Sequence, residues 1–140
     1  MSRINVGRVI VGGIIAGALA NAFDFVWNTY VLVEESAEMT ARLNLNAATV
    51  QGSMTTWIVV DFLWGLLLVF TYAAIRPRFG PGPKTAAIGG VMLWLVSAVM
   101  FAGLTAMGVF TQGAYLKSSA LYLVSTLASS VAGAWIYKEE

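Results

Sequence analysis

The sequence contains no cysteine and no histidine. Without cysteine there can be no disulfide, no thiolate nucleophile and no iron–sulfur ligation. Without histidine the commonest metal ligand, haem ligand and proton shuttle is also missing. These two absences exclude most catalytic and cofactor chemistry. We therefore predict that the protein is not an enzyme and that it carries no cofactor and no metal centre.

Charged residues are scarce as well. They make up 11% of the 140 residues, whereas soluble domains contain about 25%. The net charge of +1 provides no basic surface for displacing phosphate counterions, so nucleic acid is excluded as a partner. What the chain has instead is 59% hydrophobic residues. This composition predicts an integral membrane protein.

Four apolar runs are each long enough to cross a hydrocarbon layer of ~30 Å. The predicted spans are residues 9–33, 54–75, 85–108 and 118–137. We predict an all-α membrane protein, in which residues 1–140 form a single domain of four transmembrane helices arranged as two antiparallel hairpins. Residues 34–53 would form an outer loop and residues 76–84 a cytoplasmic loop.

The predicted outer loop carries an apolar pattern of its own. Met39, Leu43, Ala47 and Val50 follow one another at helical spacing. This spacing predicts a short helix across these positions, either lying on the membrane surface through its apolar face or solvated within the loop. The spacing does not distinguish between the two.

Residues 76–84 hold all three prolines. Proline lacks an N–H and restricts the residue before it, so we expect the second span to end at Arg76. The basic side chains Arg76, Arg78 and Lys84 would contact anionic lipid headgroups or a cytoplasmic partner. In the alternative interpretation, the basic residues only fix the topology, while proline and glycine make a compact turn.

The lysines and arginines are distributed unequally between the two sides of the predicted bundle. Arg3, Arg8, Arg76, Arg78, Lys84 and Lys138 fall on one side, and Arg42 and Lys117 on the other. Loops rich in Lys and Arg stay in the cytoplasm. Both termini and the 76–84 loop are therefore predicted to be cytoplasmic.

Two carboxylates lie inside predicted spans, and acids at such positions are functional candidates by default. Asp24 and Asp61 are ~13 Å and ~11 Å from the outer ends of their helices, so neighbouring antiparallel helices could bring them together. Asn21 and Asn28 share the helix face of Asp24 through i, i+3, i+7 spacing. We predict an intramembrane polar cluster of Asn21, Asp24, Asn28 and Asp61.

The fourth span adds a polar stripe that could complete a pocket with this cluster. Its members are Tyr122, Ser125, Thr126, Ser129 and Gly133. In the alternative interpretation, the cluster and this stripe only form hydrogen bonds between helices, worth about 0.6 kcal/mol for each pair. The oxygen atoms of the two aspartates, with those of Asn21 and Asn28, suit only a hard cation such as Mg²⁺ or Ca²⁺, and we assign no metal to them.

Small residues recur at spacings that allow helices to approach closely in lipid. In the first span these are Gly12, Gly13, Ala16, Gly17 and Ala20. They favour a non-enzymatic membrane protein that acts by helix–helix interaction, either as an accessory subunit of a larger membrane complex or as a homo-oligomer. Its partners would be membrane lipids and other membrane-protein subunits or itself. The alternative is a small proton- or cation-coupled transporter that uses Asp24 and Asp61.

Three segments carry a resemblance to known proteins. They are Ile4–Ile10 leading into Gly12–Gly17, Tyr72–Ala86 and Ala132–Lys138, of which Arg76-Pro77-Arg78-Phe79-Gly80-Pro81-Gly82-Pro83-Lys84 is the most specific part. With them the chain resembles a group of small, uncharacterised four-span bacterial inner-membrane proteins. The resemblance implies a multi-pass protein of the bacterial inner membrane with a four-helix topology. It implies no activity.

Overall fold

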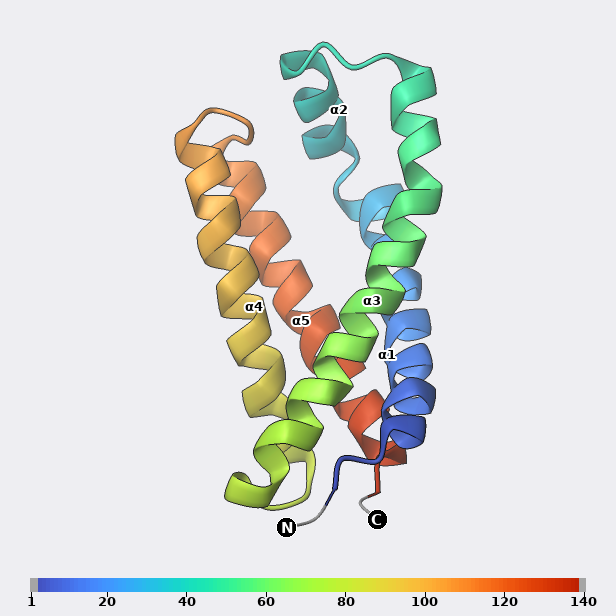
Figure 1. Ribbon diagram of the computed structural model, residues 1–140. Coiled ribbons are helices and arrows are strands. Elements are labelled where there is room, and N and C mark those ends of the chain that lie inside the picture. Colours follow the sequence, from blue (N-terminus) through green and yellow to red (C-terminus); the bar gives the residue numbers. More distant parts are fainter. Residues whose placement is uncertain (1–2, 139–140) are drawn as a thin grey trace.

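A computed structural model describes residues 3–138, which are almost entirely helical and contain no strand (Figure 1). The elements are α1 (Val6–Val26), the π-helical turn η1 (Trp27–Val31), α2 (Val33–Arg42), α3 (Ala47–Phe79), α4 (Pro83–Ala106) and α5 (Gln112–Ile136). Four of these segments, α1 with η1, α3, α4 and α5, are long and apolar enough to cross a membrane. The predicted all-α class is confirmed, and so are four helices long and apolar enough to span a membrane.

The outer segment differs from its prediction. A single helix through Met39 and Val50 is wrong, because α2 ends at Arg42 and α3 begins at Ala47. Asn44 takes a left-handed conformation (φ 50°), which interrupts the helix. The side chain of Asn46 then accepts a hydrogen bond from the backbone N–H of Thr49 (2.8 Å) and caps the start of α3. Most of the predicted outer loop is therefore helical.

The second span does not end at Arg76 as predicted. Helix α3 continues through Pro77 to Phe79, and the N–H of Gly80 donates to the carbonyl of Arg76 (2.8 Å). Proline lacks only its own N–H, so the final turn still forms. The helix ends at Gly80, where φ is 82°, a conformation that favours glycine.

The connection between α3 and α4 is therefore only residues 80–82. Pro83 opens α4 at a position where a missing N–H costs nothing. Two side chains hold the turn: the Thr85 hydroxyl donates to the carbonyl of Gly80 (2.7 Å), and the hydroxyl of Tyr72 accepts from the N–H of Gly82 (3.1 Å). The predicted nine-residue loop is a compact turn.

Helix α1 packs against α3 and α5, and α4 packs mainly against α5. The glycines of α1 make the closest contacts. A Cβ added at Gly12 would lie 2.6 Å from the carbonyl oxygen of Gly133, and one at Gly17 would lie 2.6 Å from the Cα of Phe62. The small residues of α1 are thus used inside the chain, where they bring backbones together.

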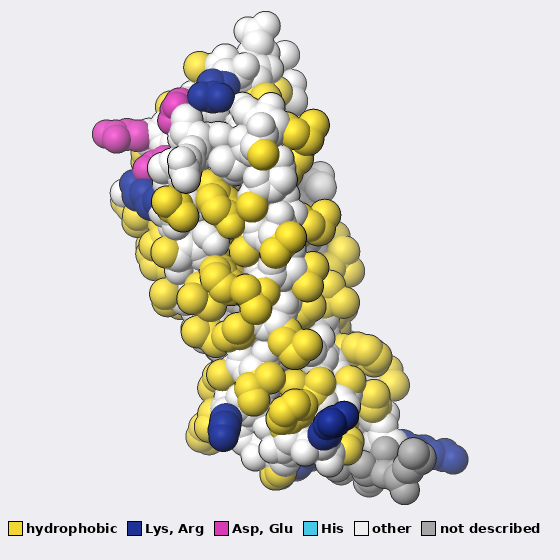
Figure 2. Space-filling model, turned by 90° about the vertical axis from the view of Figure 1, so that its left-hand side faces the viewer, with side chains coloured by type: hydrophobic (Ala, Val, Ile, Leu, Met, Phe, Trp, Pro, Cys, Tyr) yellow, Lys and Arg dark blue, Asp and Glu magenta, His cyan; other side chains and the backbone are white. Residues whose placement is uncertain are grey.

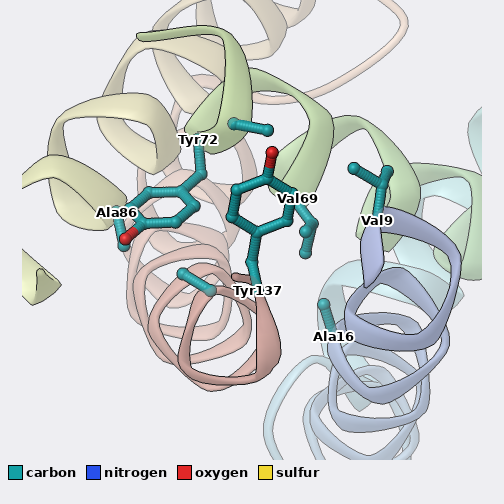
Figure 3. Close-up of a cluster of buried hydrophobic side chains, with 8 residues drawn as sticks. Val9, Ala16, Val69, Tyr72, Ala86 and Tyr137 are labelled. Atoms are coloured by element: carbon teal, nitrogen blue, oxygen red, sulfur yellow. The ribbon is translucent and has the colours of Figure 1, made fainter. Parts of the chain in front are cut away.

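At one end of the bundle, a cluster of buried side chains ties α1, α3 and α5 to one another (Figure 3). The rings of Tyr72 and Tyr137 meet edge to face at 5.9 Å, and the guanidinium of Arg76 lies 5.6 Å from the centre of the Tyr137 ring. The backbone N–H of Asn5 donates to the hydroxyl of Tyr137 (3.3 Å). The start of α1, the end of α5 and the 80–82 turn therefore share this end, which we call the turn end.

At the opposite end, which we call the α2 end, α2 lies close to the connection between α4 and α5 (Figure 1). A guanidinium nitrogen of Arg42 donates to the carbonyl of Gly108 (2.9 Å). Figure 2 shows that the middle of one face of the molecule is largely hydrophobic, with charged side chains gathered toward the two ends. This distribution suits a protein whose middle lies in hydrocarbon.

Candidate functional site

The two acids of the predicted spans lie on neighbouring helices. Asp61 is on the face of α3 that packs against α1, and only 8% of its surface is exposed. Its backbone carbonyl would lie 3.1 Å from a Cβ added at Gly17. Asp24 is half-buried, near the end of α1. The two carboxyls are close enough for their charges to interact.

Helix α5 supplies a third polar group to this site. The hydroxyl of Tyr122 lies close enough to interact with the carboxyl of Asp24 and with the side-chain amide of Asn28. The same amide donates to the backbone carbonyl of Asp24 (2.9 Å). We call Asp24, Asn28, Asp61 and Tyr122 the acid cluster. It brings together α1 with η1, α3 and α5.

The fourth predicted member, Asn21, has a different role. Its amide donates to the carbonyl of Gly17 in its own helix (3.0 Å) and to the carbonyl of Ile58 in α3 (3.3 Å). Asn21 thus links α1 to α3, as the alternative interpretation of the polar residues expects.

The polar stripe of α5 continues from Tyr122 toward the turn end. Thr126 accepts a hydrogen bond from the indole N–H of Trp64 (3.4 Å), and the Ser125 hydroxyl donates to the carbonyl of Tyr122 (3.1 Å). The hydroxyl of Ser129 is buried and forms no hydrogen bond with the described residues. Gly133 touches the backbone of α1 at Gly12. The stripe therefore combines hydrogen bonding near the acid cluster with close backbone packing beyond it.

The electrostatic setting of the acid cluster follows from the sequence. None of the four predicted spans contains a lysine or an arginine, so no basic side chain from those stretches can neutralise the two carboxyls. Within residues 3–138, no group of three or more His, Cys, Asp or Glu side chains is arranged to hold a metal ion. A pair of carboxyls with an amide and a phenol beside it can take up a proton or a small cation.

A second polar arrangement, which the sequence analysis missed, lies at the α2 end. The ammonium of Lys117 in α5 donates to the carboxylate of Glu35 (2.6 Å) and to the backbone carbonyl of Val31 (2.9 Å). The hydrogen bond from Lys117 is the main cause that holds the pKa of Glu35 below its ordinary value. Lys117 is the only basic residue near the start of the fourth apolar run, but its partners are 82 and 86 residues away in the chain, and no local pattern indicates them.

The three basic residues predicted to contact lipid or a partner lie at the turn end. Arg78 and Lys84 are exposed there, whereas Arg76 is half-buried against the ring of Tyr137. Arg76 therefore has a packing role in addition to any role at the surface.

An open hollow of about 400 Å³ lies between α4 and α5 at the α2 end. It is lined by Ala102, Thr105, Ala106, Phe110, Gln112 and Tyr115, none of which belongs to the acid cluster.

Comparison with known proteins gives no match: no protein-family model, no curated protein and no solved structure is similar to this chain. Its function has to be inferred from the side chains of the acid cluster and from the packing around them.

Proposed function

We propose that this chain is a small integral membrane protein that binds a proton or a small cation at Asp24 and Asp61 and couples this binding to transport. One observation carries the proposal: carboxyls from α1 and α3 and a phenol from α5 converge at one place in the apolar part of the chain. Polar groups that served only to join helices would be expected to form separate pairs, as Asn21 does with Ile58.

The chemistry of the cluster favours a positively charged ligand. Two carboxylates in hydrocarbon are costly unless a proton or a cation accompanies them. The phenol of Tyr122 and the amide of Asn28 can donate to a carboxylate or offer oxygen atoms to a cation. The same four side chains can therefore form hydrogen bonds with one another when no cation is bound and can offer oxygen atoms to the cation when it is bound.

The packing of the bundle supports access from the α2 end. Toward the turn end, the backbones of Gly12 and Gly133 are in contact, and the side chain of Val69 beside them is fully buried. This contact leaves no room for an ion. Asp24 lies three residues before η1, toward the α2 end. An ion would therefore enter the acid cluster from that side in the conformation described.

We also propose that the turn end faces the cytoplasm of a bacterial cell and that the protein lies in the inner membrane. The distribution of basic residues supports this orientation, because Arg76, Arg78 and Lys84 belong to the turn end and loops rich in Lys and Arg stay inside. The acid cluster would then open toward the outside, the normal source of protons for coupled uptake across this membrane.

Flux measurements in proteoliposomes test the proposed function. Proton uptake is followed with a trapped pH dye, with sodium and potassium gradients imposed in turn. The double variant Asp24→Asn/Asp61→Asn is expected to lose the pH- or ion-dependent flux, because it removes both carboxyls and nearly preserves their size. Glu34→Gln, which removes an exposed carboxyl outside the cluster, should keep the flux. An unchanged flux in the double variant would show that the acids do not carry the function.

One observation favours a second candidate, an interaction protein that acts as an accessory subunit or a homo-oligomer. The small residues of α1 are occupied within the chain, but those in the second half of α4 are not. A Cβ added at Gly103 would have no atom within 4 Å, and Ala102 and Ala106 beside it are exposed. We propose that this face is where another helix would pack.

The oligomeric state in lipid nanodiscs tests the second candidate. Gly103→Leu would prevent a close helix contact and should convert an oligomer to monomers, whereas Gly52→Leu, at another open position, should not. A wild-type protein that is monomeric at all concentrations in the nanodiscs, and that co-purifies with no other membrane protein from its own cells, would contradict this candidate.

A further inference from the structure

The π-helical turn η1 follows the acid cluster directly along the chain. It is closed by the N–H of Leu32, which donates to the carbonyl of Trp27 (2.6 Å), and it contains Asn28 of the cluster. A π-turn holds one more residue than an α-helical turn and is rare in helices. Something outside the turn must favour it here.

Lys117 supplies such an interaction. Its ammonium donates to the carbonyl of Val31, the last residue of η1, and to the carboxylate of Glu35 in the first turn of α2. The carbonyls at a helix end have no partner in their own helix. Because Lys117 in the neighbouring helix α5 donates to such a carbonyl, it fixes where η1 ends and where α2 begins.

The same helix, α5, touches this segment a second time through the acid cluster. Tyr122, five residues after Lys117, contacts Asn28 and Asp24 at the start of the turn. Helix α5 thus holds η1 at both of its ends. If the turn relaxed to the regular 3.6 residues, residues 28–31 would rotate about the axis of α1 relative to Asp24. Asn28 would then leave Tyr122.

We infer that Lys117 is a positioning residue for the acid cluster: by binding Val31 and Glu35 it keeps the π-turn formed and thereby keeps Asn28 against Tyr122 and Asp24. The importance of this role for ion binding rests on the proposed function, whereas its effect on η1 does not.

The charged groups around these contacts are few. Lys117 faces Glu35 on α2, and Glu38 on the same helix faces Arg42 (3.9 Å) and the hydroxyl of Thr111 (3.4 Å). Asp24 faces Asp61 and Tyr122. Arg42 provides a matched control, because it also ties α2 to the α4–α5 connection, through the carbonyl of Gly108, but has no contact with η1 among the described interactions.

Hydrogen exchange of the amides of residues 28–33 in nanodiscs tests the inference on its structural side. We expect exchange to be about tenfold faster in Lys117→Met, because the turn loses its external partner. Lys117→Arg should restore slow exchange, and Arg42→Met should remain within about twofold of the wild type. If Lys117→Met does not fold, Glu35→Gln weakens the same contact from its other side and should accelerate exchange in the same segment.

Infrared titration of the aspartate carboxyl bands tests the effect on the cluster. We expect the midpoint of carboxyl protonation in Lys117→Met to differ from that of the wild type by about half a pH unit or more, and that of Arg42→Met to be unchanged. Unchanged hydrogen exchange in both Lys117→Met and Glu35→Gln would overturn the inference, whatever the midpoint of carboxyl protonation. Faster exchange with an unchanged midpoint would also overturn it, since Lys117 would then have a structural role only.

Failure of the proposed function would look different. The bands that disappear in Asp24→Asn/Asp61→Asn would not titrate in the wild type, while the exchange results for Lys117 would still hold.

Discussion

Gly65 of α3 lies so close to α1 that a Cβ on it would collide with the backbone nitrogen of Gly17. Such an approach allows van der Waals contact between helix backbones, which is a main source of helix association in lipid, because apolar side chains gain little from leaving hydrocarbon. The α1–α3 pair should therefore be sensitive to a single methyl group at this contact.

We expect Gly65→Ala to destabilise the protein by about 1–3 kcal/mol, the usual cost of overfilling a packed interior. The free energy of unfolding in mixed micelles, measured by titration with a denaturing detergent, checks this. Gly52→Ala, in the same helix, is the matched control, because a Cβ there meets nothing within 4 Å, and we expect it to be neutral. Equal effects of the two substitutions would mean that α1 and α3 are not packed as described.

A second prediction concerns the contact between α4 and α5. The buried hydroxyl of Ser130 donates to the backbone carbonyl of Ala86 (2.7 Å). Ser130→Ala should cost about 0.6 kcal/mol, and at most about 1.7 kcal/mol, as measured for hydrogen bonds between membrane helices. Thr105→Ala removes a hydroxyl that bonds only within its own helix and should cost less. The same detergent titration measures both, and a greater loss in Thr105→Ala would contradict the assignment.

The bond between Glu35 and Lys117 predicts a response to acid at the α2 end. The pKa of Glu35 is lowered from its ordinary value of 4.5, chiefly by the hydrogen bond from Lys117. A lowered pKa means that the stabilisation is fully present above pH 4.5 and is lost as the pH falls through the lower value of the folded protein. We therefore expect α2 to loosen only at strongly acidic pH.

Because the chain has no cysteine, a spin label on a single Ala37→Cys variant reports the mobility of α2. The label should become mobile as the pH is lowered below 4.5, and in the added presence of Lys117→Met it should be mobile over the whole range. Loosening as the pH rises from 5 to 8 would have the wrong sign for this bond.

The lack of cysteine also allows a direct test of topology. We expect a membrane-impermeant maleimide added to intact cells to label Ala37→Cys at the α2 end and to leave Pro81→Cys at the turn end unlabelled. Both positions are exposed in the structure, so differences in burial do not bias the comparison. After the cells are opened, Pro81→Cys should react as well. Labelling of Pro81→Cys alone in intact cells would show the opposite orientation.

The four long apolar helices could be predicted because hydropathy over about 20 residues is a strong signal. The helix ends could not, because they depend on caps and not on hydropathy. Asn46 and Thr111 each accept a hydrogen bond from the third residue after them, so α3 and α5 begin several residues before the apolar runs. The end of α3 was also predicted too early, because Pro77 lies in the last turn and does not end the helix, whereas Gly80 does.

The acid cluster was partly accessible from the sequence. The similar depths of Asp24 and Asp61 and the polar stripe of Tyr122 indicated a meeting point, because depth along a helix follows from residue count. The difference between Asn21 and Asn28 was not accessible, because it depends on the rotation of α1 against α3 and on the extra residue of η1. The role of Lys117 could not be predicted either, because its partners Val31 and Glu35 lie in distant segments of the chain.

The order of the helices has a consequence for synthesis. Helix α5 packs against α1, α3 and α4, yet the ribosome makes it after all of them. The pair α1–α3 can assemble early, whereas α4 lacks its main neighbour until α5 has entered the membrane. The bundle then closes at Tyr137, near the end of the described chain, which packs on Tyr72 and holds the backbone of Asn5. Until that residue leaves the ribosome, the faces of α1, α3 and α4 that later pack against α5 are uncovered, and a chaperone or insertase would have to shield them.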